Sequence, residues 1–348
     1  MDFPAWDPVL IDIPGLPIDV RWYGLMYVVA FVVGQSMLVR LARAGFFPVS
    51  PQAAADLVFY CVFGVMLGGR LGYAIFYSEN FSLLNPLQFV QVWKGGLAFH
   101  GGLAGVGVAA WLFCRKYKVG WARTVDALSI AAPPGILAVR IANFINGELF
   151  GRVTHKGTGF AMQFPTDPVA TRLLGISDDW TMRDRELCIQ VAFGRRSFES
   201  VRDLLSSADM HGHPIDWATI GQGLEGKWAI VSKMVDVHGQ PVIPYRFPSQ
   251  LFEGLGEGLL VGLVMIVLYR LTRSRPLATG RYVAVFLLGY ASVRWSLEFV
   301  RQPDSQFGPK GTVLAGMTMG QTLSVGLVVL ALAILVWPRR REPVAAAT

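Results

Sequence analysis

Residues 317–337 read MTMGQTLSVGLVVLALAILVW, a run long enough as a helix to cross the roughly 30 Å apolar core of a bilayer. Six further runs of this kind lie near residues 21–42, 54–77, 97–114, 124–146, 251–271 and 281–300. Of the 348 residues, 53% are hydrophobic and only 16% are charged, against about 25% in ordinary soluble domains. The composition excludes a disordered chain, a coiled coil and a disulfide scaffold. It predicts an all-α polytopic membrane protein with seven transmembrane helices.

The charges predict how these helices are oriented. The chain carries a net charge of +7, yet residues 152–250 hold 11 Lys and Arg against 11 Asp and Glu, so the excess lies entirely in the apolar part. Connections on one side of the predicted helices, at 40–43, 115–123, 270–281 and 339–341, hold 13 of the 20 Lys and Arg residues that lie outside residues 152–250. By the positive-inside rule we expect the N-terminus outside and the C-terminus in the cytoplasm. The basic excess therefore indicates membrane topology and not nucleic-acid binding.

The same pattern divides the chain into three regions. Residues 1–146 would hold the first four helices, residues 147–250 a small extramembrane domain, and residues 251–348 the last three helices and a basic cytoplasmic tail. A short helix is expected within the extramembrane domain near Glu199–Ser206. The three cysteines, Cys61, Cys114 and Cys188, lack the spacing of a metal site, so no metal or cofactor is expected.

Ionisable side chains inside the predicted helices gather toward the outer face. Each such group costs roughly 2.5–3.5 kcal/mol at a helix centre, so it needs a partner or a function. With the predicted orientation, the outer half receives Tyr23, Arg70, His100, Arg140, Asn143, Glu253, Glu257, Arg294, Glu298 and Arg301. We therefore expect one polar, water-accessible site that several helices build and that opens to the outer side.

Spacing along the helices leaves two readings open for the arginines. Arg294, Glu298 and Arg301 recur at i, i+4 and i+7 and share one helix face, where they either neutralise one another or act on a ligand. Arg140 is suited to bidentate binding of a phosphate or carboxylate. The alternative for Arg140 is a structural ion pair, for example with Glu148.

The remaining polar residues also have two readings. His100 is either a general base or a hydrogen-bonded packing residue. Tyr23 lies where aromatic belts lie at the membrane interface. Arg70 is too deep to reach the interface easily, so it needs a buried partner, for which Glu253 and Glu257 are candidates.

Glycine and proline predict two features of packing. The glycines within 68–72 and 101–105 would let two helix backbones approach closely. The run Pro133-Pro134-Gly135 should kink the fourth predicted helix. Asp126, near the inner end of that helix, is expected to be an ordinary solvated residue.

These residues by themselves favour two classes of protein. One is an enzyme that acts on an anionic lipid headgroup. The other is a transporter or binder of an anionic lipid or solute with an outward-facing cationic site. Transporters more often show inverted repeats and a site at the bilayer midplane, and neither is visible in this sequence.

Residues 138–151, AVRIANFINGELFG, resemble the signature of the bacterial prolipoprotein diacylglyceryl transferases. Further motifs resemble that family in the same order along the chain. They are RWYGLMY at 21–27, GGRLGY at 68–73, FHGGL at 99–103, FPSQLFE at 247–253, and Arg294 followed by RQPD at 301–304. Together they span nearly all of the predicted membrane part.

The resemblance implies seven transmembrane helices in the bacterial inner membrane, with a periplasmic head domain and an active site facing the periplasm. It also implies transfer of a diacylglyceryl group from phosphatidylglycerol to the lipobox cysteine thiol of a prolipoprotein. The products would be a thioether-linked prolipoprotein and glycerol 1-phosphate. The positions that match functionally important residues of the family are Tyr23, His100, Arg140, Asn143, Asn146, Glu148, Gly151, Arg294 and Glu298.

The resemblance also suggests roles for these positions. His100 and Tyr23 would be catalytic, Arg140 would bind the lipid phosphate, and Arg294 would meet the charge of the leaving group. Asn143, Asn146, Glu148, Gly151 and Glu298 would bind or orient phosphatidylglycerol, with Arg70, Arg301 and Glu253 in support.

Two departures from the family pattern stand out. Residues 165–240 look like an insertion in the head domain. Phe247 and Phe252 stand where His and Tyr are common, so no role is expected for these two side chains.

Overall fold

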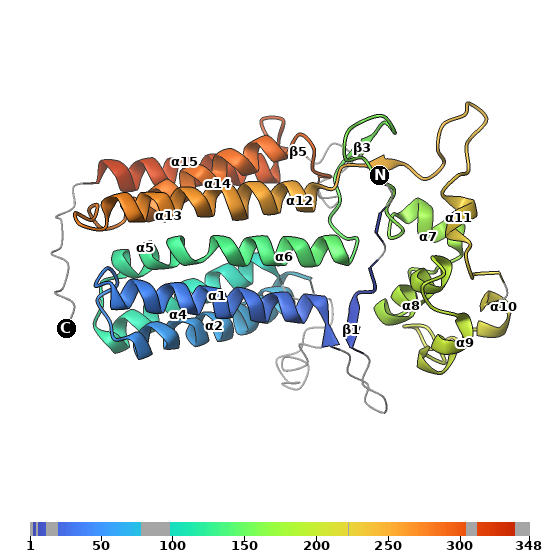
Figure 1. The fold of residues 1–348 in the computed structure, drawn as a ribbon, viewed down its shortest axis with the longest axis horizontal. Coiled ribbons are helices and arrows are strands. Elements are labelled where there is room, and N and C mark those ends of the chain that lie inside the picture. Colours follow the sequence, from blue (N-terminus) through green and yellow to red (C-terminus); the bar gives the residue numbers. More distant parts are fainter. Residues whose placement is uncertain are drawn as a thin grey trace. The chain divides into compact units, whose positions relative to one another are not determined.

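The computed structural model describes residues 3–4, 6–11, 20–77, 98–221, 223–303 and 312–337, without the side chains of residues 76, 77, 99 and 100. Asp304 of the last motif and the basic residues at 339–341 lie outside this part of the chain. Helices dominate the described ranges, and each labelled element can be followed in Figure 1.

A helix or helix pair occupies each range in which the sequence predicts a membrane span. The helices are α1 (Trp22–Arg43), α2 (Pro51–Tyr77), α4 (Phe99–Tyr117), α5 (Trp121–Ala131), α6 (Pro133–Ile145), α12 (Ser249–Glu253), α13 (Val261–Thr272), α14 (Arg281–Leu297) and α15 (Met319–Val336). A π-helical stretch, η3 (Gly254–Leu260), joins α12 to α13.

Four of these helices are long and apolar enough to cross a membrane, and a fifth span is added if α5 and α6 count as one. The four are Trp22–Arg43, Pro51–Ile75, Ser249–Thr272 and Met319–Val336. The prediction of a helical membrane protein is confirmed at this level.

The kink predicted at Pro133 is confirmed. Helix α5 ends at Ala131, α6 begins at Pro133, and the two axes are bent by 44°. Proline has no backbone N–H to continue the hydrogen bonding of α5, but it is well suited to the first position of a helix. The break therefore follows from the local sequence.

The described chain forms two compact units. The first contains Met1–Tyr27, Leu137–Leu255 and Val293–Leu323, and the second contains Val28–Ile136, Gly256–Ser292 and Ser324–Thr348.

In the second unit, α2 packs along α4 through glycines (Figure 1). A Cβ atom added at Gly105 would overlap the carbonyl oxygen of Gly64, and one added at Gly68 would overlap that of Gly101. A Cβ at Gly72 would lie 2.8 Å from the Cα atom of Gly101. The predicted close approach of two helix backbones is confirmed, and it leaves no room for side chains at these positions.

The expectation that Asp126 is solvated is wrong. Its side chain is fully buried, and its two carboxylate oxygens accept hydrogen bonds from the backbone N–H groups of Gly280 (2.7 Å) and Val283 (3.0 Å). Asp126 thus caps the start of α14, where unsatisfied N–H groups and the helix dipole both favour a carboxylate. The partner is more than 150 residues away in sequence, so local spacing could not reveal it.

In the first unit, residues between the membrane helices fold around their own hydrophobic core. The helices are α7 (Pro168–Leu174), α8 (Met182–Ala192), α9 (Phe198–Val201), the 3₁₀ turn η2 (Arg202–Leu204), α10 (Trp217–Gly221) and α11 (Trp228–Val231). Leu174, Leu187, Val191, Leu224 and Ile243 are among the buried core residues. The short helix predicted near Glu199–Ser206 is confirmed by α9 and η2.

Capping residues set the ends of two of these helices. The Asp167 carboxylate accepts from the N–H of Val169 at the start of α7, and Gly175, with a φ of 81°, follows the end of that helix. The Thr181 hydroxyl accepts from the N–H of Asp184 at the start of α8. Side chains of these types are preferred at N-caps, and glycine is preferred after a helix end.

Three short antiparallel strand pairs complete the described structure. They are β1 (Val9–Ile11) with β2 (Val20–Arg21), β3 (Val153–Thr154) with β4 (Tyr245–Arg246), and β5 (Thr312–Leu314) with β6 (Met317–Thr318). The pair β3–β4 closes the base of the segment that contains α7 to α11, because it brings residues before and after that segment together.

Candidate active site

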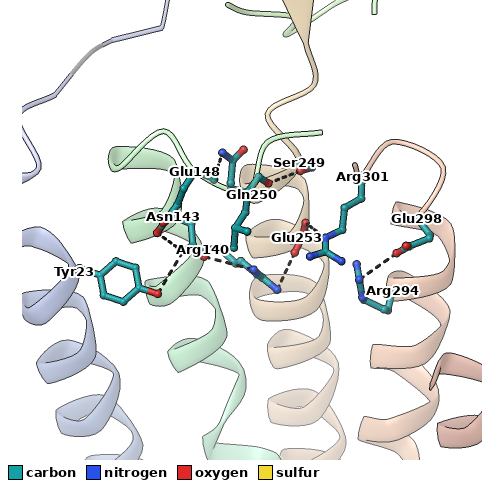
Figure 2. Close-up of polar contacts among 11 residues, drawn as sticks. Tyr23, Arg140, Asn143, Glu148, Ser249, Gln250, Glu253, Arg294, Glu298 and Arg301 are labelled. Carbon is teal, nitrogen blue, oxygen red and sulfur yellow. Dashed lines mark hydrogen bonds and ion pairs between the residues drawn. The ribbon is translucent and has the colours of Figure 1, made fainter. Parts of the chain in front are cut away.

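Ten of the predicted site residues lie in the first unit, and most of them are drawn in Figure 2. The first turn of α1 supplies Tyr23, the last turns of α6 supply Arg140 and Asn143, and α12 supplies Glu253. The others lie at the end of α14 or in the turns that follow α6 and α14; they are Asn146, Glu148, Gly151, Arg294, Glu298 and Arg301.

Asn143 is the centre of one group of contacts. Its amide nitrogen donates to Glu148 Oε1 at 2.9 Å and lies 3.5 Å from the hydroxyl oxygen of Tyr23. The amide nitrogen of Asn146 lies 3.5 Å from the same Glu148 oxygen. Burial raises the pKa of the Glu148 carboxyl, and the two amide donors oppose that rise. Glu148 is therefore a partly desolvated carboxyl group held in place by amides.

The turn after α6 holds Glu148 in this position. Gly147 and Leu149 have φ angles of 68° and 58°, and for leucine this left-handed conformation is unfavourable. Hydrogen bonds from α12 stabilise the turn: Gln250 Nε2 donates to the carbonyl of Glu148 at 2.6 Å, and Ser249 Oγ donates to that of Leu149 at 3.0 Å. The sequence singled out Ser249 and Gln250 only as members of a motif. These two hydrogen bonds show how they contact the site.

Arg140 and Arg301 meet at one buried carboxylate. Arg140 Nη2 lies 2.8 Å from Glu253 Oε2, and Arg301 Nε lies 3.5 Å from Glu253 Oε1, so the three side chains point toward one another (Figure 2). Glu253 is 0% exposed. Arg140 Nη1 also lies 3.5 Å from Asn143 Oδ1. The sequence made Glu253 a candidate partner of Arg70. In this unit, Glu253 contacts Arg140 and Arg301.

Arg294 and Glu298 form an ion pair, which is one of the two alternatives that their spacing left open. Arg294 Nη2 lies 3.1 Å from Glu298 Oε2, and the Glu298 side chain is 3% exposed. Gly320, near the start of α15, lies against this pair. A Cβ atom there would overlap Glu298 Oε2 and would lie 2.9 Å from Arg294 Nη2. No pattern in the sequence singles out Gly320, since its importance comes from a contact between separate helices.

We expect Gly320→Ala to lower the activity of the site by about tenfold, because a shift of 1 Å in a positioned group can cost as much as a hundredfold. The added methyl group would displace the Arg294–Glu298 pair. Gly326→Ala on the same helix is the control, since no described atom lies within 4 Å of its Cβ position. Initial rates at equal amounts of folded protein would measure the effect, and equal rates for the two variants would contradict the expectation.

Gly151 lies where three backbone segments meet. Its N–H donates to the carbonyl of Phe247 at 2.8 Å, and the N–H of Arg152 donates to that of Val300 at 2.8 Å. A Cβ atom at Gly151 would overlap the Val300 carbonyl oxygen. The position therefore has no room for a side chain. Phe247 contacts Gly151 through its backbone, which any residue could supply.

The other two predicted site residues, His100 and Arg70, belong to the second unit. His100 is in the first turn of α4, and its side chain lies outside the described residues. Arg70 is on α2, with its guanidinium carbon 5.9 Å from the centroid of the Tyr73 ring.

The ten residues of the first unit balance their formal charges. The arginines are Arg140, Arg294 and Arg301, and the carboxylates are Glu148, Glu253 and Glu298. Guanidinium groups held in place by carboxylates are preorganised to bind a phosphate, and amides beside them can bind hydroxyl groups. Within the described ranges, no group of three or more His, Cys, Asp or Glu side chains could hold a metal ion.

Comparisons with known proteins agree with this chemistry. A family model described as prolipoprotein diacylglyceryl transferase matches residues 8–337. The phosphatidylglycerol–prolipoprotein diacylglyceryl transferases of Burkholderia ambifaria and Burkholderia multivorans are each 37% identical over 350 residues, which covers 99% of this chain and 98% of theirs. That of Paraburkholderia phytofirmans is 34% identical over 342 residues, covering 97% and 95%. The chain therefore belongs to the prolipoprotein diacylglyceryl transferase family.

Proposed function

We propose that this protein transfers the diacylglyceryl group of phosphatidylglycerol to the lipobox cysteine of a prolipoprotein. Its family membership supports this reaction. The structural observation that carries the proposal is Arg140, which is held between Asn143 and the buried Glu253 and is thereby aligned to bind a phosphate.

In the reaction, the cysteine sulfur attacks the carbon of the diacylglyceryl group that bears the phosphate, and a thioether forms. The bond from that carbon to the phosphate oxygen breaks, and glycerol 1-phosphate leaves with the bonding electrons. A free cysteine has a pKa of about 8.5, so only a small fraction is thiolate at neutral pH. We assign His100 as the base that takes the thiol proton. The charge that develops on the leaving phosphate would be stabilised by arginine.

The contacts suggest which side chains bind the lipid and which stabilise the leaving group. Arg140 would bind the lipid phosphate, and Arg294 would meet the charge of the leaving group. Asn143, Asn146 and Glu148, which contact one another, would orient the hydroxyl groups of the lipid headgroup. Tyr23 reaches the same group through Asn143.

The remaining residues would support these groups. Glu253 and Arg301 would hold Arg140, and Glu298 would hold Arg294. Gly151 would shape the turn after α6. We keep Arg70 as a supporting residue on α2.

We also propose seven transmembrane helices with the N-terminus outside, the C-terminus in the cytoplasm, and the active site facing the periplasm of the inner membrane. In this arrangement residues 1–146 hold four helices, 147–250 form a periplasmic head domain with an insertion near 165–240, and 251–348 hold three helices and the tail. Two observations support it: helices occupy all seven expected ranges, and the residues of α7 to α11 have a hydrophobic core of their own.

The reaction is tested with purified protein in vesicles that contain phosphatidylglycerol, supplied with a lipobox peptide or its Cys→Ser variant. We expect a diacylglyceryl adduct on the cysteine peptide alone, with release of an equal amount of glycerol 1-phosphate. Mass spectrometry of the peptide and an assay of the phosphate product measure both. If folded protein produced no adduct, the site would have to be reinterpreted as that of a transporter or binder of an anionic lipid.

A further inference from the structure

Resting on the proposed function, we propose that Glu186 is a positioning residue for Tyr23 and acts through Arg21. The segment 165–240 would then help to set the geometry of the active site. Glu186 is on α8, within that segment, and none of the motifs that point to the function contains it.

The contact that carries the proposal is an ion pair next to the start of α1. Arg21 Nη1 lies 2.9 Å from Glu186 Oε1 and 2.7 Å from Glu186 Oε2. Arg21 ends β2 and directly precedes α1, so it is two residues from Tyr23. The Glu186 side chain is 14% exposed and that of Arg21 is 30% exposed, so water screens this pair less than a fully exposed one.

Helix α8 is well fixed in the first unit. The buried Asp184 near its start accepts hydrogen bonds from the Thr181 hydroxyl at 2.6 Å and from the N–H of Ser206 at 2.9 Å. On the same helix, Leu187 and Val191 are buried in the hydrophobic core. A side chain on this helix therefore offers Arg21 a fixed partner.

The same helix also contacts the chain on the other side of β1 and a second part of the site. Gln190 Nε2 donates to the carbonyl of Trp6 at 3.3 Å. Glu186 and Gln190 line a cavity of about 20 Å³ together with Asn146, which contacts Glu148. A cavity of this size holds about one water molecule. Helix α8 thus adjoins both Tyr23, through Arg21, and Asn146.

Tyr23 needs such support because its contact with the site is long. Its hydroxyl oxygen is 3.5 Å from Asn143 Nδ2, at the upper limit of a hydrogen bond. A small rotation of the first turn of α1 would break it. Besides the strand pairing, the backbone at this point is held by the hydrogen bond from the N–H of Trp22 to the carbonyl of Pro8, at 3.1 Å. The ion pair of Arg21 adds a side-chain anchor to that backbone contact.

The test compares Glu186→Gln with Asp178→Asn. Asp178 forms an ion pair with the same helix α8, 2.8 Å from Arg185 Nη2, and this pair involves no residue of β1, β2 or α1. With wild-type protein transferring in the same assay, we expect Glu186→Gln to lower kcat about five- to tenfold and to leave KM for phosphatidylglycerol within about twofold. Asp178→Asn should leave both constants within about twofold of the wild type.

A second readout does not depend on transfer. With 3-fluorotyrosine at position 23, we expect Glu186→Gln to shift or broaden the ¹⁹F resonance and Asp178→Asn to leave it unchanged. The charge exchange Arg21→Glu with Glu186→Arg should restore the wild-type resonance. If Glu186→Gln does not fold, Glu186→Asp replaces it and should move the resonance less. A wild-type resonance and wild-type kcat in the Glu186 variant would overturn the proposal, as would equal effects of Asp178→Asn. Absence of transfer by the wild type would instead count against the proposed function.

Discussion

Arg140→Ala is expected to lower diacylglyceryl transfer by about a thousandfold, the upper range for losing one preorganised charge-stabilising group. Arg140 combines a positive charge with a fixed orientation, because Glu253 holds one of its nitrogens at 2.8 Å and Asn143 lies 3.5 Å from another. Arg140→Lys keeps the charge but loses the planar fork, so we expect an intermediate rate. The measurement is the initial rate of adduct formation on the lipobox peptide.

The same substitution should also destabilise the protein, and this effect must be separated from catalysis. Removing Arg140 takes one of two arginines from the fully buried Glu253, and breaking a buried ion pair typically costs about 3–5 kcal/mol. The double variant Arg140→Ala with Glu253→Gln removes the carboxylate charge as well. It should regain much of the lost thermal stability without regaining transfer. Near-normal transfer in the single variant, or its recovery in the double variant, would show that Arg140 has only a structural role.

Gly105→Ala is expected to prevent normal packing of α2 against α4 and to destabilise the protein by about 3 kcal/mol or more, the upper range for overpacked sites. The added Cβ would overlap the backbone carbonyl of Gly64. Because both groups belong to helix backbones, no side-chain rotation can relieve the overlap. Melting of the detergent-solubilised protein, followed by circular dichroism, measures the loss.

Gly107→Ala on the same helix is the matched control. No described atom lies within 4 Å of its Cβ position, and alanine is favoured over glycine inside a helix by about 1 kcal/mol. We expect this variant to melt at or above the wild-type temperature. If the two alanine variants melted alike, the close approach of α2 and α4 would be wrong.

Features that depend on neighbours in the sequence were predictable. The apolar runs placed the helices, and Pro133 placed the break between α5 and α6. The four-residue spacing placed Arg294 and Glu298 on one helix face, where they form an ion pair. Periodicity and proline stereochemistry act over a few residues, so one sequence is enough to read them.

Features that depend on which helices meet were not predictable in this way. Spacing could not predict the contacts of Glu253 with Arg140 and Arg301, or the burial of Asp126 at the start of α14. The motifs did single out the residues around Asn143 as candidate site residues, but not the hydrogen bonds from Ser249 and Gln250 that hold the turn at Leu149. In each case the contact joins segments that only the folded chain brings together.

The ion pair of Arg21 with Glu186 also constrains the order of events during synthesis. Its two partners are separated by 165 residues, so the first part of the chain emerges long before α8 exists. At about 5–20 residues per second, that interval lasts roughly 8–33 s. During this time α1 can form, but its N-terminal end lacks this partner. The surroundings of Tyr23 are therefore completed late, although Tyr23 is among the first residues to be made.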